Sequence, residues 1–321
     1  MKNYKVAVIG CGYWGKNLVR KFSELGSLAA ICDTDKTQAR NIAKLYGNVP
    51  IMDMEEISMN TTIDGVAIAS PAIFHAEHVK KFLKAGKHVF VEKPLALNLN
   101  DAIALQELAD QQKLILMVGH IVQYHPAYIQ LKNFIKNGTL GNLKYIYSNR
   151  LNIGKIRTEE NVFWSFAPHD ISMVLGLTND PIAEVKTEGL NFFNNNISDL
   201  ATINFKFKTG LKAHIFVSWI NPFKEQKLVV IGDKSMAVFD DSLDWLDKLR
   251  LYSHDITFKN GVPLVQKAEA TPIRLNPEEP LKKECEHFLE CIEKRITPQT
   301  DAAEAIRVLQ VLTMVQESLN I

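Results

Sequence analysis

Short apolar runs alternate with helical patterns over the first 120 residues. Continuous apolar runs predict buried strands, and apolar residues at every third or fourth position predict amphipathic helices. The predicted strands are Val6–Ile9, Leu28–Cys32, Gly65–Ala69, Val89–Val91 and Leu114–Val118. The predicted helices are Trp14–Leu25, Thr37–Tyr46, one through Val79 and Phe82 to Ala85, and Asn100–Gln112. Apolar strands that alternate with helices favour a parallel sheet covered on both faces.

The pattern changes after Pro126. A helix is predicted over Ala127–Lys136, with a stop signal at Asn137-Gly138. A second helix is expected near Pro168–Leu177, and the region from Ile182 to Tyr252 is rich in strands. Apolar and polar positions alternate in two of these strands, around a turn at Lys208-Thr209-Gly210: Ala201-Ile203-Phe205-Phe207 and Leu211-Ala213-Ile215-Val217. This alternation predicts an antiparallel sheet with one packed face.

The chain closes with two predicted helices, Pro280–Lys294 and Asp301–Asn320. Asp301 and Glu304 have the spacing of a helix cap. We therefore expect an α/β fold with a doubly wound Rossmann domain over residues 1–120. An α+β domain with a large, mainly antiparallel sheet should follow over 121–321, with residues 280–321 packing back toward the first domain.

Composition narrows the function. The 321 residues carry a formal net charge of +1, which argues against a broad basic face for nucleic acid. We recognise no signal peptide, no membrane-spanning run and no zinc spacing among the four cysteines, so a metal and a membrane are not expected and the cytoplasm is the expected compartment. A chain of this length favours two domains.

Residues 10–15 read Gly-Cys-Gly-Tyr-Trp-Gly, directly after the first strand and at the start of the first helix. In this context Gly10 permits a tight turn, Gly12 lets the backbone approach a pyrophosphate, and Gly15 lets helix and strand pack closely. The helix N-terminus then offers free N–H groups to the phosphates. The alternative is a tight turn without a ligand.

Asp33 ends the second strand, where an acid accepts hydrogen bonds from the adenosine ribose and repels a 2′-phosphate. The cofactor prediction is therefore NAD rather than NADP, although the nearby Lys36 leaves NADP open. Two further polar segments follow strands: Ser70-Pro71 with His75, and Glu92-Lys93-Pro94. Ligands bind at strand ends in such sheets. The plainer interpretation of Lys93 is a solvated surface lysine.

These motifs, with Gly119-His120 and Tyr124-His125-Pro126, resemble the Gfo/Idh/MocA oxidoreductases over nearly the whole chain. The resemblance implies that Lys93 contacts both the substrate hydroxyl and the nicotinamide ribose, and that Glu92 lies beside the cofactor. The implied cofactor-binding residues are Gly10, Gly12, Tyr13, Trp14, Gly15, Asp33, Ser70, Pro71, His75, Glu92 and Lys93. The implied substrate-binding residues are Lys93, His120, Tyr124, Arg157, Asn161, Trp164 and His169. Aromatic residues of this kind are as often core, and Arg157 as often a surface arginine.

His169 matches the catalytic histidine of the family, but Ser165 stands where many members carry an aspartate four residues earlier. Asp170 could substitute only if its side chain turned toward the histidine. Pro168 suits the first turn of a helix, which would place His169 at a helix N-terminus. The positive dipole end would lower the pKa of His169 and keep a neutral base available. The alternative is a histidine that only caps or packs.

The Tyr-Trp glycine loop and the segment 164–170 look most like the sugar-nucleotide branch of the family. That branch includes 3-dehydrogenases of UDP-N-acetylglucosamine and its uronate, which serve cell-envelope glycan or lipid A synthesis. Three alternatives remain: a sugar-nucleotide 3-ketoreductase, an NAD-dependent glycosidase, and a non-catalytic dinucleotide sensor. The resemblance also implies a homodimer or homotetramer assembled through the antiparallel sheet.

Overall fold

The computed structural model describes residues 4–154, 156–193 and 196–319. Its contacts divide the chain into two compact units. The first contains the chain up to Tyr124 together with Glu279–Leu309, and the second contains His125–Glu278 and the residues from Gln310 onward.

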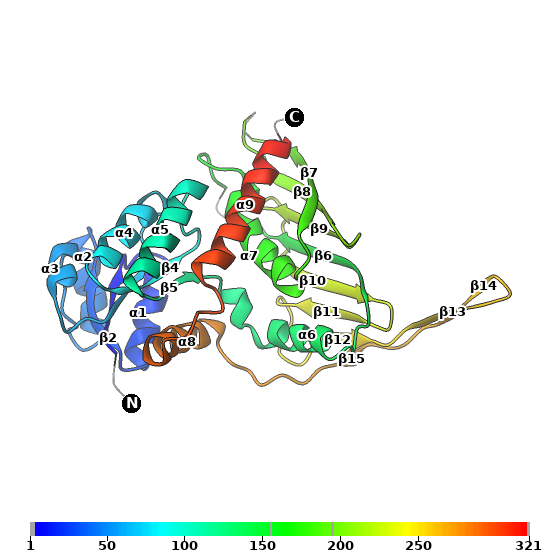
Figure 1. Cartoon of the computed structure of the whole chain (residues 1–321), viewed down its shortest axis with the longest axis horizontal. Helices are drawn as coiled ribbons and strands as arrows, with labels where there is room; N and C mark the ends of the chain where they lie inside the picture. The colour runs from blue at the N-terminus through cyan, green and yellow to red at the C-terminus, as the bar shows by residue number, and fades with distance from the viewer. Residues whose placement is uncertain (1–3, 155, 194–195, 320–321) are drawn as a thin grey trace. The chain divides into compact units, whose positions relative to one another are not determined.

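The first unit is built on five parallel strands in the order β2-β1-β3-β4-β5, which confirms the predicted Rossmann fold. Its helix α4 packs on α5 and α1 packs on α8, so two helix pairs flank the sheet (Figure 1). The strands are β1 (Val6–Ile9), β2 (Leu28–Cys32), β3 (Gly65–Ile68), β4 (His88–Glu92) and β5 (Leu116–Gly119). The helices are α1 (Gly15–Glu24), α2 (Lys36–Leu45), α3 (Met54–Met59), α4 (His75–Lys84), α5 (Leu99–Gln112) and α8 (Pro280–Lys294), with short 3-10 turns at Ala72–Phe74 and Ile121–Tyr124.

The core of this unit, called the Rossmann unit below, includes a helix from the far end of the sequence. Phe288 of α8 packs edge-on against Phe22 of α1 and Phe90 of β4, with ring centroids 6.4 and 5.9 Å apart. All three rings are fully buried. The next helix, α9 (Ala302–Leu319), begins in the same unit and is capped by the Asp301 carboxylate, which accepts from the Glu304 N–H at 2.8 Å. That cap confirms the predicted one, and the predicted last residue of the helix, Asn320, lies outside the described residues.

The second unit, called the sheet unit, contains an eight-stranded sheet in the order β15-β12-β11-β10-β6-β9-β8-β7. Only the β6–β9 pair among these is parallel, so the sheet is mainly antiparallel as predicted. Its strands are β6 (Leu143–Leu151), β7 (Ile182–Leu190), β8 (Leu200–Phe207), β9 (Lys212–Ser218), β10 (Glu225–Gly232), β11 (Met236–Asp240), β12 (Leu249–Tyr252) and β15 (Thr271–Pro272).

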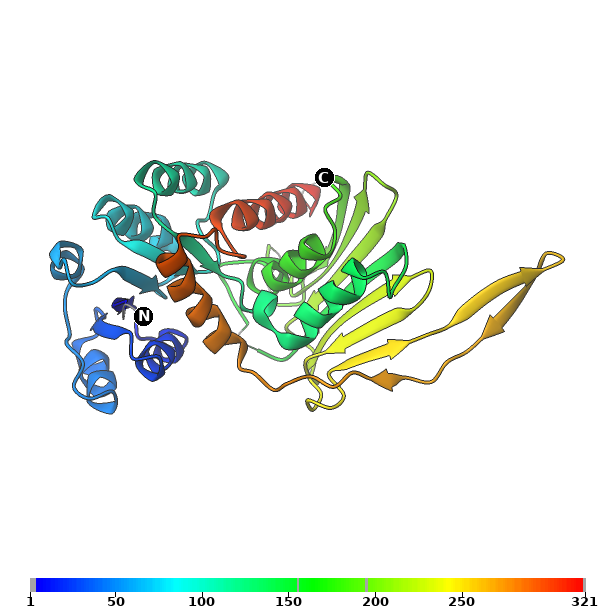
Figure 2. The same cartoon turned by 60° about the horizontal axis from the view of Figure 1, so that its bottom comes forward.

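Helices cover one face of this sheet (Figure 2). They are α6 (Pro126–Lys136), α7 (Val162–Leu177) and the later part of α9. The residues that face them are fully buried, as with Ile146 of β6, Ile203 of β8 and Ile215 of β9. The positions between them point to the opposite face, where side chains such as Tyr147 are only half-buried.

Helix α7 begins much earlier than predicted. It starts at Val162, so Pro168 lies inside the helix and His169 lies in its middle. The prediction of a helix N-terminus at Pro168 is therefore wrong. Proline is favoured in a first turn but is also found inside helices, where it removes one backbone hydrogen bond.

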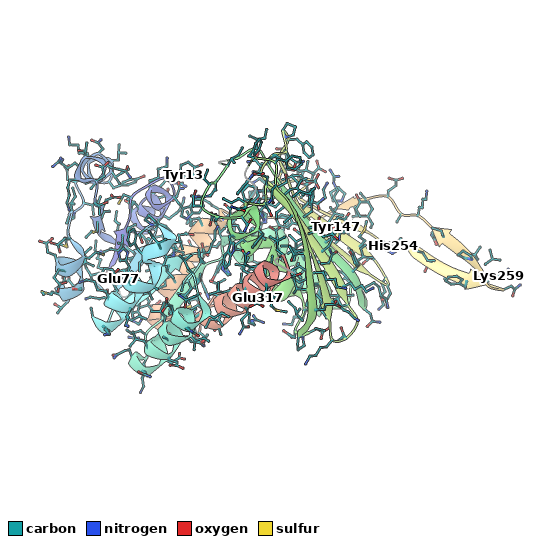
Figure 3. All side chains as sticks on the ribbon, turned by 90° about the horizontal axis from the view of Figure 1, so that it is seen from above. Tyr13, Glu77, Tyr147, His254, Lys259 and Glu317 are labelled. Carbon is teal, nitrogen blue, oxygen red and sulfur yellow. The ribbon has the colours of Figure 1, made fainter. Side chains whose placement is uncertain are left out.

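A hairpin that we did not predict extends from the sheet unit (Figure 1). Its strands, β13 (Asp255–Lys259) and β14 (Val262–Gln266), form a separate two-stranded sheet, and all of their residues are exposed. Lys259 marks the tip in Figure 3. The turn is Asn260-Gly261, with φ of +53° and +79°, which is the dipeptide that favours two-residue hairpins.

Candidate functional site

The carboxyl ends of the five parallel strands lie at one edge of the Rossmann sheet, because parallel strands share one direction. Most of the predicted site residues of this unit follow directly at these ends. They are Gly10 after β1, Asp33 after β2, Ser70 just beyond β3, Glu92 and Lys93 at β4, and Gly119 and His120 at β5. In open parallel sheets, ligands bind outside the carboxyl ends of the strands, so this edge is the candidate binding edge.

The glycine loop fits the geometry expected of a phosphate-binding turn. Gly10 has φ +87° and donates its N–H to the Cys32 carbonyl at 2.8 Å. A Cβ at Gly15 would lie 1.8 Å from the Gly10 carbonyl oxygen, so only glycine lets α1 pack this closely. A Cβ at Gly12 would meet no heavy atom of the described residues within 4 Å. Gly12 therefore faces open space of the kind a pyrophosphate needs.

Two aromatic residues of the loop have different environments. Tyr13 is 88 % exposed (Figure 3). The ammonium group of Lys16 lies over its ring, 5.4 Å from the centroid. Trp14 immediately precedes α1, and its indole Nε1–H donates to the Glu92 carboxylate. Trp14 thus joins the glycine loop to the end of β4.

Asp33 holds the same loop from the other side. Its carboxylate accepts from the Cys11 N–H at 2.6 Å and from the Asp35 N–H at 2.8 Å. A carboxylate offers about four lone-pair sites, so this one retains acceptor capacity for ribose hydroxyls. Asp33 therefore both shapes the loop and fits the role of a ribose ligand.

Glu92 is a half-buried residue at the end of β4. Burial raises its pKa to about 7, against the opposing effects of the Trp14 hydrogen bond and the Lys93 charge. A Cβ at Gly119 would lie 2.9 Å from Glu92 Oε2, so glycine at that position leaves room for the carboxylate. A carboxyl group that titrates near neutrality at a binding edge is typical of a functional site.

His75 is buried at the start of α4, with 1 % of its surface exposed. Its Nδ1 lies 2.6 Å from the Pro94 carbonyl oxygen and its Nε2 lies 2.8 Å from the Ser70 carbonyl oxygen. Ser70 Oγ lies 3.0 Å from Nδ1 of His78. His75 therefore contacts the two segments that follow β3 and β4.

His120 and Tyr124 lie deeper than a pocket-lining role requires. His120 is 2 % exposed, with Nδ1 2.5 Å from Glu304 Oε2. Tyr124 is buried in the core of the Rossmann unit, where its hydroxyl lies 3.2 Å from Thr300 Oγ1. Burial is the main cause of a raised pKa of Tyr124. Both side chains are therefore held by contacts within the Rossmann unit.

In the sheet unit, α7 carries the predicted His169, which is half-buried, and Trp164, whose Nε1–H donates to Gln316 Oε1 at 3.2 Å. Asn161 precedes the helix and accepts the Ser198 N–H on Oδ1 at 2.6 Å. Arg157 pairs with Glu160 at 3.0 Å and with Glu159 at 3.4 Å. Arg157 is therefore already engaged by two carboxylates.

Asp170 does not serve His169. It is 1 % exposed and accepts from Ser148 Oγ at 2.6 Å and from Arg150 Nε at 2.5 Å, both on β6. The carboxylate thus faces the sheet and ties α7 to β6. Because its side chain does not turn toward His169, Asp170 does not replace the aspartate that many family members carry.

The sequence did not predict the environments of two buried glutamates, although Glu304 was predicted to take part in a helix cap. Glu304 pairs with His120, and Glu284 of α8 is fully buried with no hydrogen-bond partner for either oxygen among the described residues. Burial, and then the charge of Glu92, raise the pKa of Glu284 well above its usual range. A signal was present, because Glu284 falls on the apolar stripe of Leu281, Cys285 and Phe288.

The residues present fit NAD. The glycine loop offers an open approach at Gly12, the start of α1 offers N–H groups, and Asp33 offers acceptors for a ribose. Among the described residues, no cluster of three or more His, Cys, Asp or Glu side chains is placed to hold a metal ion. No described helix has the length and apolar character needed to cross a bilayer.

Comparisons with known proteins agree with this geometry. Residues 4–120 match the family model described as an oxidoreductase family with an NAD-binding Rossmann fold. Residues 128–238 match the model of the GFO/IDH/MocA C-terminal domain. The two matches together take in most of the chain and both of its units.

Several similar proteins are named as dehydrogenases. UDP-N-acetylglucosamine 3-dehydrogenase of Acidithiobacillus ferrooxidans is 25 % identical, over 100 % of this chain and 98 % of that protein. Its solved structure superposes with a TM-score of 0.87 at 24 % identity, covering 99 % of this chain and 98 % of that one. Myo-inositol 2-dehydrogenase of Thermotoga maritima is 27 % identical, over 74 % of this chain and 75 % of that protein. This chain therefore belongs to the Gfo/Idh/MocA family and is an NAD-dependent oxidoreductase that acts on a CH–OH group.

Proposed function

We propose that this enzyme oxidises a hydroxyl group of a nucleotide sugar, namely C3 of UDP-N-acetylglucosamine or its uronate, to a 3-keto sugar. The observation that carries the catalytic part of the proposal is the Trp14–Glu92 hydrogen bond. It joins the glycine loop, which fits the cofactor phosphates, to the segment that bears Lys93. A fixed link of this kind supports a lysine that acts at the bound cofactor.

The proposed chemistry uses two side chains of this chain. Lys93 orients the hydroxyl and stabilises negative charge that develops on its oxygen. His169 takes the hydroxyl proton as a general base, a contribution of about 10²–10⁴-fold in rate. Bound NAD supplies the hydride acceptor. Trp164 of α7 and Asn161, which precedes α7, are proposed as substrate contacts. Arg157 is proposed as the group for a substrate carboxylate or diphosphate, which would replace its present partners Glu159 and Glu160.

The choice of substrate rests on similarity along the whole chain. The dehydrogenase of Acidithiobacillus ferrooxidans that matches the full length acts on UDP-N-acetylglucosamine by its name. The myo-inositol dehydrogenase matches a smaller share of the chain. We accordingly propose a place in cell-envelope glycan or lipid A synthesis, where a 3-keto sugar is the substrate for a later transamination.

A panel assay tests this function. Purified protein is incubated with NAD and with UDP-N-acetylglucosamine, its uronate, myo-inositol or glucose, with a 2-oxo acid present to recycle the cofactor. We expect the unchanged chain to form a product two mass units lighter than the nucleotide sugar. Lys84→Ala, a control at an exposed lysine of α4, should form the same product, and Lys93→Ala should not. Turnover of inositol or glucose alone would overturn the nucleotide-sugar assignment.

We also propose that Asp33 selects NAD over NADP. The carboxylate would stand against the 2′-phosphate of NADP, so fluorescence titration should give the lower Kd for NAD. Asp33→Ala should narrow the gap between the two Kd values. Tighter binding of NADP by the unchanged protein would remove this role from Asp33.

For assembly, we propose a homodimer or homotetramer that pairs the uncovered faces of the large sheet. Tyr147 of β6 stacks on His214 of β9 there, with ring centroids 5.3 Å apart, and Tyr145 bonds His214 Nδ1 at 2.8 Å. Aromatic residues of this kind are enriched in interfaces. Light scattering should show a multiple of the 36.2 kDa chain, and Tyr147→Asp should reduce it. A monomer at micromolar concentration would contradict this assembly.

A further inference from the structure

One imidazole ring bridges two of the strand-end segments of the Rossmann unit. His75 Nδ1 lies 2.6 Å from the carbonyl oxygen of Pro94, and its Nε2 lies 2.8 Å from the carbonyl oxygen of Ser70. The side chain is 1 % exposed. Both ring nitrogens are therefore engaged by backbone atoms rather than presented to a ligand.

The segment on the Nδ1 side carries the reactive lysine. Lys93 directly precedes Pro94, and Glu92 directly precedes Lys93. A hydrogen bond to the Pro94 carbonyl thus acts one peptide unit away from Lys93. Because proline has no N–H, its carbonyl is the only backbone hydrogen-bonding group that Pro94 has.

The position of the proton on the His75 ring decides whether the contact with Pro94 or the contact with Ser70 is a hydrogen bond. A carbonyl oxygen can only accept, so a ring nitrogen must donate to it, and neutral imidazole has a single N–H. Burial is the main cause of a lowered pKa of His75. The contacts with the Pro94 and Ser70 carbonyl oxygens oppose this shift, and the charge of Lys93 makes a smaller lowering contribution. His78 is a further titratable group that interacts electrostatically with His75. Nδ1 lies closer to its carbonyl oxygen than Nε2 does, so we assign the single N–H of the neutral ring to Nδ1, where it donates to Pro94.

We infer that His75 is a positioning residue for Lys93, and that its Nδ1–H holds the Pro94 carbonyl and so fixes the Glu92-Lys93-Pro94 segment at the binding edge. The inference rests on the proposed function for the identity of the reaction, but the contact itself is a property of the Rossmann unit. It assigns His75 an indirect role in place of the direct cofactor contact that the family resemblance implies.

Two conservative variants separate the two contacts. In His75→Asn the side-chain amide nitrogen is attached to Cγ, as Nδ1 is, so the variant keeps a donor toward Pro94. In His75→Gln the amide nitrogen lies one bond further out, near the place of Nε2, so the donor points toward Ser70. His75→Ala removes both contacts. His78→Ala is the matched control, because His78 lies on the same helix and contacts the Ser70 side chain instead.

Amide hydrogen exchange gives a readout that needs no substrate. The full-length variants are compared at one pH, with exchange followed at the amides of Lys93 and Leu95. We expect exchange faster by about tenfold in His75→Gln and His75→Ala, the size of effect produced by one lost hydrogen bond, and near-normal exchange in His75→Asn and His78→Ala. If His75→Ala does not fold, the Asn and Gln variants still decide the question.

Turnover adds a second readout. kcat for NAD-linked oxidation should fall in the same order, with a smaller change in the KM for NAD. Equal exchange in the Asn and Gln variants, or unchanged exchange in His75→Ala, would overturn the assignment of His75. The predicted exchange order with no turnover of any nucleotide sugar, even by the unchanged chain, would contradict the proposed function and support the role of His75.

Discussion

The Trp14 indole N–H donates to the Glu92 carboxylate across 78 residues of sequence. Trp14 belongs to the glycine loop and Glu92 to the end of β4, so one hydrogen bond connects the predicted phosphate site with the predicted reactive lysine. The charged carboxylate is the stronger acceptor for this bond. Because the pKa of Glu92 is about 7, its charge changes within the range in which an enzyme normally works.

This relationship predicts a pH dependence of cofactor binding. As pH falls through about 7, Glu92 takes up a proton and its bond to Trp14 weakens, so the affinity for NAD should fall. Trp14→Phe removes a bond that favours the charged form, which raises the pKa of Glu92 and should move the midpoint to higher pH. Glu92→Gln cannot titrate and should abolish the midpoint. An unchanged midpoint in Glu92→Gln, measured by titration with NAD, would show that another group is responsible.

Gly12 gives a test of the cofactor site that is separate from folding. A Cβ at Gly12 meets no described atom within 4 Å, whereas a Cβ at Gly15 would lie 1.8 Å from the Gly10 carbonyl oxygen. Gly12→Ala should keep the unfolding temperature of the unchanged protein but weaken NAD binding by roughly tenfold or more, because the methyl group occupies the path of the pyrophosphate. Gly15→Ala should instead lower the unfolding temperature. Normal NAD affinity in Gly12→Ala would place the phosphates elsewhere.

Glu284 predicts a stability change with a defined sign. An acid whose pKa is raised on folding binds its proton more tightly in the native state, so the native state loses stability as pH rises above the ordinary pKa. Glu284→Met removes that loss and fills similar volume. Its free energy of unfolding should exceed that of the unchanged chain, by an amount that grows from acid to alkaline pH.

Denaturant unfolding at several pH values measures this difference, with Glu284→Gln as the isosteric control. The Gln variant should lose the pH dependence but keep a buried polar group. A Met variant that is less stable than the unchanged chain at every pH would mean that the Glu284 carboxyl contributes a favourable interaction.

The Rossmann fold was predictable because its signals are local. Each strand is a short apolar run, and Gly10 and Gly15 are required by the backbone itself, through a positive φ and a close approach. Asp33 was predictable for the same reason, since it ends a strand beside that loop. The hydrogen bonds that Asp33 accepts from backbone N–H groups were not predictable, because they depend on the three-dimensional path of the loop.

The sheet unit was less predictable where polar residues are buried. Strand β6 was missed because its core-facing positions include Ser148 and Arg150, which are polar and bond to Asp170. The sequence of β6 therefore lacks the regular alternation of apolar and polar residues that predicts a strand. Pro168 misled the prediction of α7, because a preference for the first turn does not forbid an interior position.

Transfer of a hydride from C3 of the sugar to NAD is the step on which the proposed function depends. The most direct measurement uses UDP-N-acetylglucosamine, or its uronate, with deuterium at C3, together with NAD and the full-length protein, followed by mass analysis of the cofactor. We expect deuterium in the NADH formed by the unchanged chain, and we expect Lys93→Ala and His169→Ala each to lower the rate of deuterium transfer by about 10²-fold or more. NADH without deuterium, or deuterium transfer at a normal rate in Lys93→Ala, would contradict the proposed function.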